Sequence, residues 1–155
     1  MSWYWEDMEV GMTDRFGPIH VEREAVLDFA RRFDPQPFHL DEEAAAGTHF
    51  GRLAASGWHT CSMMMAAMVE RWQQVPGWQA QSLGAMGVDE LRWRRPVFPG
   101  DTLRGESMLA EKIESRSRPE MGIIKWRTRL FNQDEKEVLS LISIVMQRRR
   151  PAGEA

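Results

Sequence analysis

The sequence contains almost no cysteine, no long apolar run and no marked excess of one charge. Cys61 is the only cysteine in 155 residues, so an intrachain disulfide is excluded and a reducing compartment is favoured. No apolar run approaches the roughly 20 residues that cross a bilayer. The first residues, "MSWYWEDMEVGM", lack the basic start and apolar stretch of a signal peptide. We therefore expect a soluble, cytoplasmic protein with no membrane partner.

The balance of charge and the spacing of histidines exclude two further classes. The formal net charge is −3, which is not the basic surplus of a nucleic-acid-binding protein. His20, His49 and His59 have no metal-ligand spacing with one another or with Cys61. Ordinary polar contacts are the expected role of these histidines, and no metal site is predicted.

Tryptophan and methionine, in contrast, are abundant. Seven Trp and eleven Met indicate a large, adaptable apolar interior or pocket. The length suits one domain, which we assign to residues 1–150. Residues 151–155, "PAGEA", are expected to form a disordered C-terminal tail.

Two helices stand out from the apolar periodicity. In "EREAVLDFARRF", residues 22–33, Val26, Phe29, Ala30 and Phe33 recur at helical spacing, and the helix should end where Asp34 precedes a proline. Residues 56–72, "SGWHTCSMMMAAMVERW", are apolar or small nearly all round, so we expect a helix buried on most sides with Ser56 as its N-cap. The 34–55 segment reads as a loop with a short helix near "DEEAAA".

The second half of the chain predicts antiparallel strands joined by short turns. Strands are expected within residues 88–98, 102–116, 124–130 and 137–147. In "IKWRTRL", basic side chains alternate with mostly apolar ones. This alternation places the following non-basic residues on one face of the strand: Ile124, Trp126, Thr128 and Leu130. The order of elements predicts an α+β domain in which an antiparallel sheet wraps a long central helix.

The segment "DPQPFH" holds an acid and an imidazole on a stiff backbone. Pro35 and Pro37 fix φ, and both preceding residues favour extended conformations. Rigidly held Asp34 and His39 suit water activation or proton transfer. The alternative, more common for such a pair, is that Asp34 only ends the helix and His39 makes an ordinary polar contact.

A second feature lies at the start of the long helix. If Ser56 is the N-cap, the N–H groups of Gly57, Trp58 and His59 have no partner within the helix. Such donors can hold a carbonyl oxygen as it becomes an enolate, and glycine lets a substrate approach the backbone. Alone, "SG" is simply a helix start. Together with Asp34 and His39, it suggests proton chemistry next to a carbonyl.

These residues resemble the MaoC-like dehydratase family, which includes the R-specific enoyl-CoA hydratases. The family pattern, roughly Asp-x-Asn-Pro-x-His followed by a glycine that opens the central helix, is similar to "DPQPFHLDEEAA" and "ASGWHT". "WEDMEVGM" and "GVDELRWRRPVFPGDTL" resemble further parts of the family. Two positions depart from the pattern, because Gln36 replaces asparagine and Ser56 stands where many members have histidine.

The resemblance implies a single hot-dog domain, usually found as a homodimer or an assembly of dimers. It also implies a 2-enoyl-CoA substrate, with no cofactor beyond the coenzyme A of that substrate. Asp34 and His39 match the catalytic pair that handles one water, and Gly57 matches the residue whose N–H holds the thioester carbonyl. Ser56, Trp58 and His59 are weaker candidates for substrate contacts.

Several points stay open from the sequence. A thioesterase and a non-catalytic acyl-thioester-binding subunit of the same fold are the alternatives to a hydratase. Acyl length and the division of protons between Asp34 and His39 are also open. So is the identity of the arginines that grip the CoA phosphates, among the candidates Arg92, Arg94, Arg95, Arg127 and Arg129.

Overall fold

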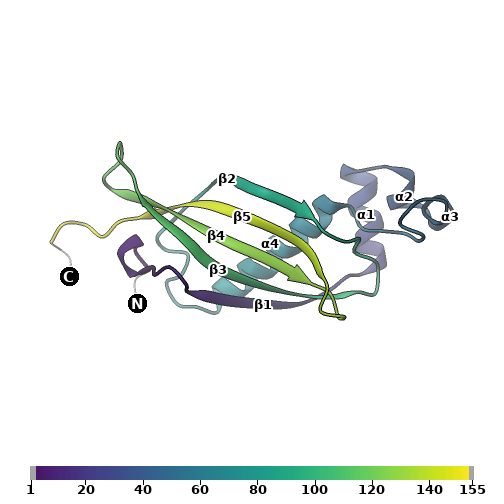
Figure 1. Cartoon of the computed structure of the whole chain (residues 1–155), viewed down its shortest axis with the longest axis horizontal. Helices are drawn as coiled ribbons and strands as arrows, with labels where there is room; N and C mark the ends of the chain where they lie inside the picture. The colour runs from purple at the N-terminus through teal and green to yellow at the C-terminus, as the bar shows by residue number, and fades with distance from the viewer. Residues whose placement is uncertain (1–2, 154–155) are drawn as a thin grey trace.

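A computed structural model describes residues 3–153 as one antiparallel sheet with a long helix against one face (Figure 1). The spatial order of the strands is β1-β3-β4-β5-β2. Their bounds are β1 (Thr13–His20), β2 (Ser82–Trp93), β3 (Thr102–Glu114), β4 (Met121–Phe131) and β5 (Glu137–Arg148). This arrangement confirms the predicted α+β class and the hot-dog fold.

The helices all lie on the same side of the sheet. They are α1 (Arg23–Phe33), α2 (Pro37–Leu40), α3 (Glu42–Ala46) and α4 (Gly57–Gln73), preceded by the single 3-10 turn η1 (Trp5–Asp7). The first three gather at one end of the sheet, where α4 also begins (Figure 1). The sheet is therefore open on its other face, and the loops around α2 meet the start of α4.

The N-terminus of α4 is capped as predicted, but its burial is not. The Ser56 hydroxyl accepts a hydrogen bond from the Trp58 N–H, which identifies Ser56 as the N-cap. His59, Thr60, Met64 and Met68 are buried, whereas Met65 is 42% exposed. The expectation of burial on most sides is therefore wrong for the single chain, because the sheet covers only one side of α4.

The inner face of the sheet forms two apolar clusters. The first joins α1 and α4 to the sheet through residues such as Val26, Met64 and Leu139. The second lies nearer the N-terminal segment and contains Met8, Leu109, Ile124 and Trp126. The predicted alternation in β4 is confirmed, because the four side chains expected on one face are all buried: Ile124, Trp126, Thr128 and Leu130.

Three elements differ from the prediction. β1 was not foreseen, because its "FGPIH" contains a glycine and a proline that weaken a strand pattern; as an edge strand, it tolerates the proline. β2 begins at Ser82, six residues earlier than expected, since Gly84 and Gly87 hide its start. The loop prediction also missed α2, a single turn that begins at Pro37.

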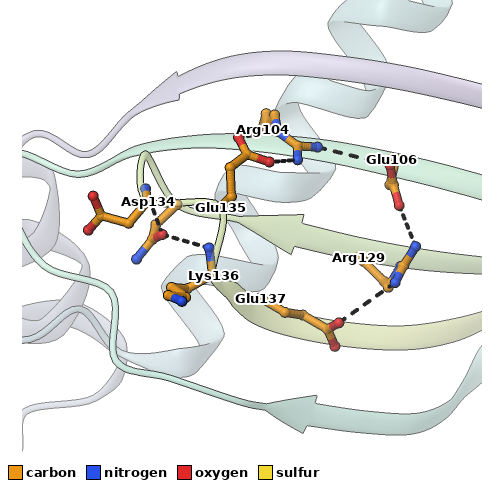
Figure 2. Close-up of polar contacts among 8 residues, drawn as sticks. Arg104, Glu106, Arg129, Asp134, Glu135, Lys136 and Glu137 are labelled. Atoms are coloured by element: carbon orange, nitrogen blue, oxygen red, sulfur yellow. Dashed lines mark hydrogen bonds and ion pairs between the residues drawn. The ribbon is translucent and has the colours of Figure 1, made fainter.

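The outer face of the sheet carries a network of ion pairs instead of a helix. Figure 2 shows Arg129 between Glu106 and Glu137, and Arg104 paired with Glu135. The Arg129–Glu106 distance is 2.5 Å and the Arg129–Glu137 distance is 3.9 Å. These arginines are therefore paired with glutamates of neighbouring strands and of the β4–β5 turn on a solvated face.

The two ends of the described chain lie together at the end of the sheet remote from α1 (Figure 1). Arg149 pairs with Glu6 at 2.9 Å, and Arg150 pairs with Asp7 at 2.5 Å. Beyond them residues 151–153 are exposed, and the rest of the predicted tail, 154–155, lies outside the described residues. Within residues 3–153 no helix combines the length and apolarity needed to cross a bilayer.

Candidate active site

Asp34 lies where α1 ends, and its backbone is fixed as the following proline requires. Its φ of −150° and ψ of 67° are outside the helical region, while its N–H still donates to Ala30. The side chain is only 16% exposed. The prediction that Asp34 ends the helix is confirmed, and the same geometry turns its carboxylate toward α2 and the start of α4.

His39 lies in α2 and is 5% exposed. Its Nδ1 is 2.7 Å from the Ala54 carbonyl oxygen. Because a carbonyl only accepts, Nδ1 carries a hydrogen and donates it to Ala54, which fixes the orientation of the ring. Its Nε2 lies 3.5 Å from Asp34 Oδ2. The Phe38 and Phe50 rings pack around the imidazole, so the two functional groups face each other in a fixed orientation.

Ser56 connects the acid to the helix. Its hydroxyl, fully buried, donates to Asp34 Oδ2 at 2.7 Å while accepting from the Trp58 N–H. Burial acts to raise the pKa of Asp34. The hydrogen bonds from Ser56 and Gln36 and the proximity of His39 outweigh it, so the pKa lies below its ordinary value. The carboxylate is therefore kept ionised beside the imidazole.

Gln36 departs from the family pattern but contacts the acid directly. Its amide nitrogen donates to Asp34 Oδ1 at 2.7 Å, and its side chain is exposed. Asp34 is thus held on both oxygens, by a buried hydroxyl on one and an exposed amide on the other. The Gln36 side chain, which is longer than that of asparagine, folds back onto the carboxylate of Asp34, two residues earlier in the sequence.

Gly57 is the first residue of α4, so no carbonyl of a preceding helical turn accepts a hydrogen bond from its N–H. The Trp93 ring lies directly over it: a side chain at this position would place its Cβ 2.4 Å from the indole. Trp93 Nε1 also donates to the Gly57 carbonyl at 2.9 Å. Only glycine fits this contact, because the aromatic ring occupies the space of a side chain.

These groups line one cavity of about 510 Å³. Asp34, His39, Gly57 and Trp58 all contribute to its wall. Further lining residues reach the site from distant segments: His49, Phe50, Trp93, Arg94 and Arg95. The two arginines were among the candidates for the CoA phosphates, whereas no sequence pattern placed the other three at the site. Arg94 and Arg95 add positive charge, although both also contact β5.

His59 is not among the residues that line this cavity. It is 7% exposed and stacks on Phe29 with ring centroids 4.8 Å apart. Its Nδ1 is buried with no hydrogen-bond partner among the described residues. Burial lowers the pKa of His59, so the ring is held neutral. The structure therefore brings together five of the six predicted site residues, with Ser56 behind the wall, and leaves His59 in the α1–α4 contact.

A family model for the MaoC like domain matches residues 7–125. That segment includes every residue of the candidate site described above. A crystal structure of a MaoC-like dehydratase from Rhodospirillum rubrum is 38% identical and superposes with a TM-score of 0.84, covering 96% of this chain and 98% of that one.

Two curated relatives have names that describe thioester chemistry. The mesaconyl-CoA hydratase of Cereibacter sphaeroides is 38% identical over 87 residues, which are 56% of this chain and only 25% of that protein. The 3-hydroxybutyryl-CoA dehydratase of Methylorubrum extorquens is 34% identical over 117 residues, 74% of this chain and 69% of that protein. The matched segment, the fold and the arrangement of Asp34, His39 and Gly57 lead to one assignment: the chain belongs to the MaoC-like dehydratase family.

Proposed function

We propose that this protein adds water to the double bond of 2-enoyl-CoA thioesters and catalyses the reverse dehydration of 3-hydroxyacyl-CoA. The observation that carries the proposal is the pairing of Asp34 Oδ2 with His39 Nε2, 3.5 Å apart, in a cavity that Gly57 also lines. The names of the two CoA-thioester relatives support this substrate class. Coenzyme A enters as part of the substrate, and no further cofactor is required.

In this reaction the pair Asp34/His39 binds one water. The water oxygen bonds to C3 of the enoyl group, and the pair accepts a water proton. The electrons of the C2–C3 double bond move toward the thioester carbonyl, whose oxygen gains negative charge. The Gly57 N–H and the α4 dipole stabilise that charge. A proton returned to C2 completes the addition of one H₂O.

The test is hydration of 2-enoyl-CoA substrates of four and twelve carbons, monitored as loss of the enoyl-thioester absorbance with a thiol reagent present. The wild-type protein should consume the enoyl group without releasing free CoA. Asp34→Asn should lower kcat by about 10²-fold or more, because proton transfer by a positioned side chain contributes that much. Asp28→Asn, on the exposed side of α1, is the matched control and should leave kcat unchanged.

The alternatives give different results in the same assay. A thioesterase would release thiol, and its acid product would keep the C2–C3 double bond. A binding subunit would show no turnover, with acyl-CoA affinity indifferent to Asp34→Asn. Either result would overturn the hydratase proposal.

We further propose that the working protein is a homodimer joined through β2 and the exposed side of α4. β2 is an edge strand, and residues 3–153 supply no strand on its outer side. Large apolar side chains are exposed on these elements: Trp58, Met65, Met86, Val88 and Trp93. Such an edge is a liability unless another strand or surface covers it. Light scattering should give a dimer mass for the wild type and a monomer for Val88→Lys.

A further inference from the structure

A second cavity, of about 310 Å³, lies between α4 and the inner face of the sheet. We call it the distal chamber. Met64, Met68 and Trp72 line it from α4, and Trp126 and Ser143 line it from the sheet. It has no lining residue in common with the candidate active site. Its wall is therefore rich in the two residue types that are abundant in the sequence.

The distal chamber begins beyond the reach of a short acyl group. Met64 is seven residues after Gly57 and Trp72 is fifteen, so the chamber spans from roughly 10 to 22 Å along the helix from the carbonyl-binding amide. An extended chain advances roughly 1.2 Å per bond, by analogy with the extended backbone. An acyl group whose carbonyl lies at Gly57 reaches Met64 after about eight bonds.

Met64 stands at the junction of the two cavities. Thr60 lines the active-site cavity, and Met64, one turn later on the same helix, lines the distal chamber. Methionine is unbranched and has three rotatable bonds, so its side chain can move aside with little cost. An alkyl chain that follows α4 from the active-site cavity would therefore meet a side chain that can move aside.

The wall of the distal chamber farthest from Gly57 is fixed by aromatic packing and by hydrogen bonding of the N-terminal segment. Met8 and Trp78 line it, and Trp78 packs on Trp3 with ring centroids 4.6 Å apart. Trp5 anchors the same N-terminal segment by donating to the Ile123 carbonyl at 3.2 Å. The wall thus sets a definite limit to the length of any chain that enters.

The lining discriminates against charge. Asp14 is the only charged residue among the described residues that line the distal chamber, and its carboxylate is paired with Arg71 at 2.9 Å. Ser107 and Thr128 satisfy each other by a hydrogen bond of 2.8 Å. No cation is available on this wall for an acyl group with a second carboxylate, and burying an unpaired charge is costly.

We propose that the distal chamber receives the end of an uncharged acyl chain of about ten or more carbons, and that this protein selects such acyl-CoA thioesters over short or carboxylated ones. The inference rests on the proposed function, since it takes Gly57 as the site of the thioester carbonyl. It adds the class of acyl group, which the catalytic residues do not specify.

The test is a series of 2-enoyl-CoA substrates from four to fourteen carbons. Once the chain enters the distal chamber, kcat/KM should rise by roughly fourfold for each added methylene, because each CH₂ leaves water for an apolar wall. A ten-carbon substrate with a terminal carboxylate should fall at least about tenfold below its uncharged counterpart. A kcat/KM that is highest at four carbons, or equal for the two ten-carbon substrates, would overturn the proposal.

Ser143 offers a matched pair of variants. It lines the distal chamber from β5, and no side-chain hydrogen bond involves it within residues 3–153. Ser143→Leu should fill the chamber and lower kcat/KM for twelve- and fourteen-carbon substrates by about tenfold or more, with four-carbon turnover within about twofold of wild type. Ser143→Ala removes the hydroxyl without adding bulk and should leave long-chain turnover intact. Equal losses at every chain length in Ser143→Leu would contradict the proposal.

A binding measurement separates this inference from the proposed function. Saturated acyl-CoAs cannot be hydrated, and calorimetry reports their affinity whether or not the protein is a hydratase. Dodecanoyl-CoA should bind more tightly than butanoyl-CoA, and Ser143→Leu should abolish the difference. If hydration is absent but this difference is present, the proposed function fails and the distal chamber stands. If four-carbon substrate is hydrated but the difference is absent, the chamber proposal fails alone.

Discussion

The Ser56 hydroxyl donates to Asp34 Oδ2 at 2.7 Å while the same oxygen caps α4 by accepting from the Trp58 N–H. One buried side chain thus orients the proposed catalytic carboxylate and fixes the helix end that presents the Gly57 N–H. The two halves of the site, 22 residues apart in sequence, are positioned relative to each other by a single hydroxyl.

Ser56→Ala should therefore affect activity in a way that a purely structural loss would not. Without this hydrogen bond the pKa of Asp34 rises, so the acidic limb of the kcat/KM profile should move to higher pH. The loss of the cap should cost about 1 kcal/mol of unfolding free energy. Ser56→Thr, which keeps a hydroxyl, should restore the limb. Ser117→Ala, at an exposed turn, is the control for the substitution type. An unshifted limb in Ser56→Ala would contradict this role.

Gln36→Ala should shift the acidic limb of the kcat/KM profile in the same direction as Ser56→Ala, but by less. Gln36 also donates to Asp34 at 2.7 Å, but its side chain is exposed and water can replace it. The acidic limb should move less than in Ser56→Ala, and kcat should fall by no more than about tenfold. The measurement is the pH profile of both variants side by side. A larger shift for Gln36→Ala would show that the exposed amide is the main support of the acid.

Gly57→Ala should damage both stability and activity through Trp93. The new Cβ would lie 2.4 Å from the indole, so the ring must move, at a cost of about 1–3 kcal/mol. Thermal unfolding should report the loss, and Gly47→Ala, whose Cβ would meet nothing closer than 3.8 Å, is the matched control. In the double variant Gly57→Ala/Trp93→Ala the two losses should be less than additive. Full additivity would rule out the contact as the cause.

His59 should make the fold sensitive to acid. Burial lowers the pKa of His59 in the folded state from the ordinary 6.5. Below that pH the unfolded chain therefore binds a proton at His59 more readily than the folded chain does. Stability should consequently fall as the pH drops below about 6.5. His59→Phe keeps the packing on Phe29 and should flatten this part of the stability–pH curve, as measured by denaturant unfolding. His20→Phe, at an exposed position, should leave the curve unchanged.

The sequence predicted best those elements in which local pattern and tertiary burial agree. α1, α4, β3, β4 and β5 were found from periodicity, because one face of each meets the core. β1 and the start of β2 were missed, since both are edge strands that contain glycine and owe their shape to a neighbour. The apolar pattern of α4 also overstated its burial, because apolar side chains on the side of α4 away from the sheet remain exposed in this chain.

For the site, the sequence predicted the candidate residues but not the contacts that hold them in place. Asp34, His39 and Gly57 lie in short motifs whose backbone chemistry is local. The bond from Ser56 to Asp34 and the Trp93 ring over Gly57 join segments that only the sheet brings together. No spacing in the sequence encodes such pairs. His59 failed as a cavity residue for the same reason, since the side of α4 that it occupies is set by α1.

The strand order has a consequence for how the protein is made. β5 lies between β4 and β2, yet it leaves the ribosome after both. Until it emerges, β2 has no strand to pair with, and its apolar residues stay open to water and to other chains. The nascent polypeptide should therefore be unable to complete its fold until synthesis has passed Arg148. A chain that lacks β5 should depend on chaperones or precipitate.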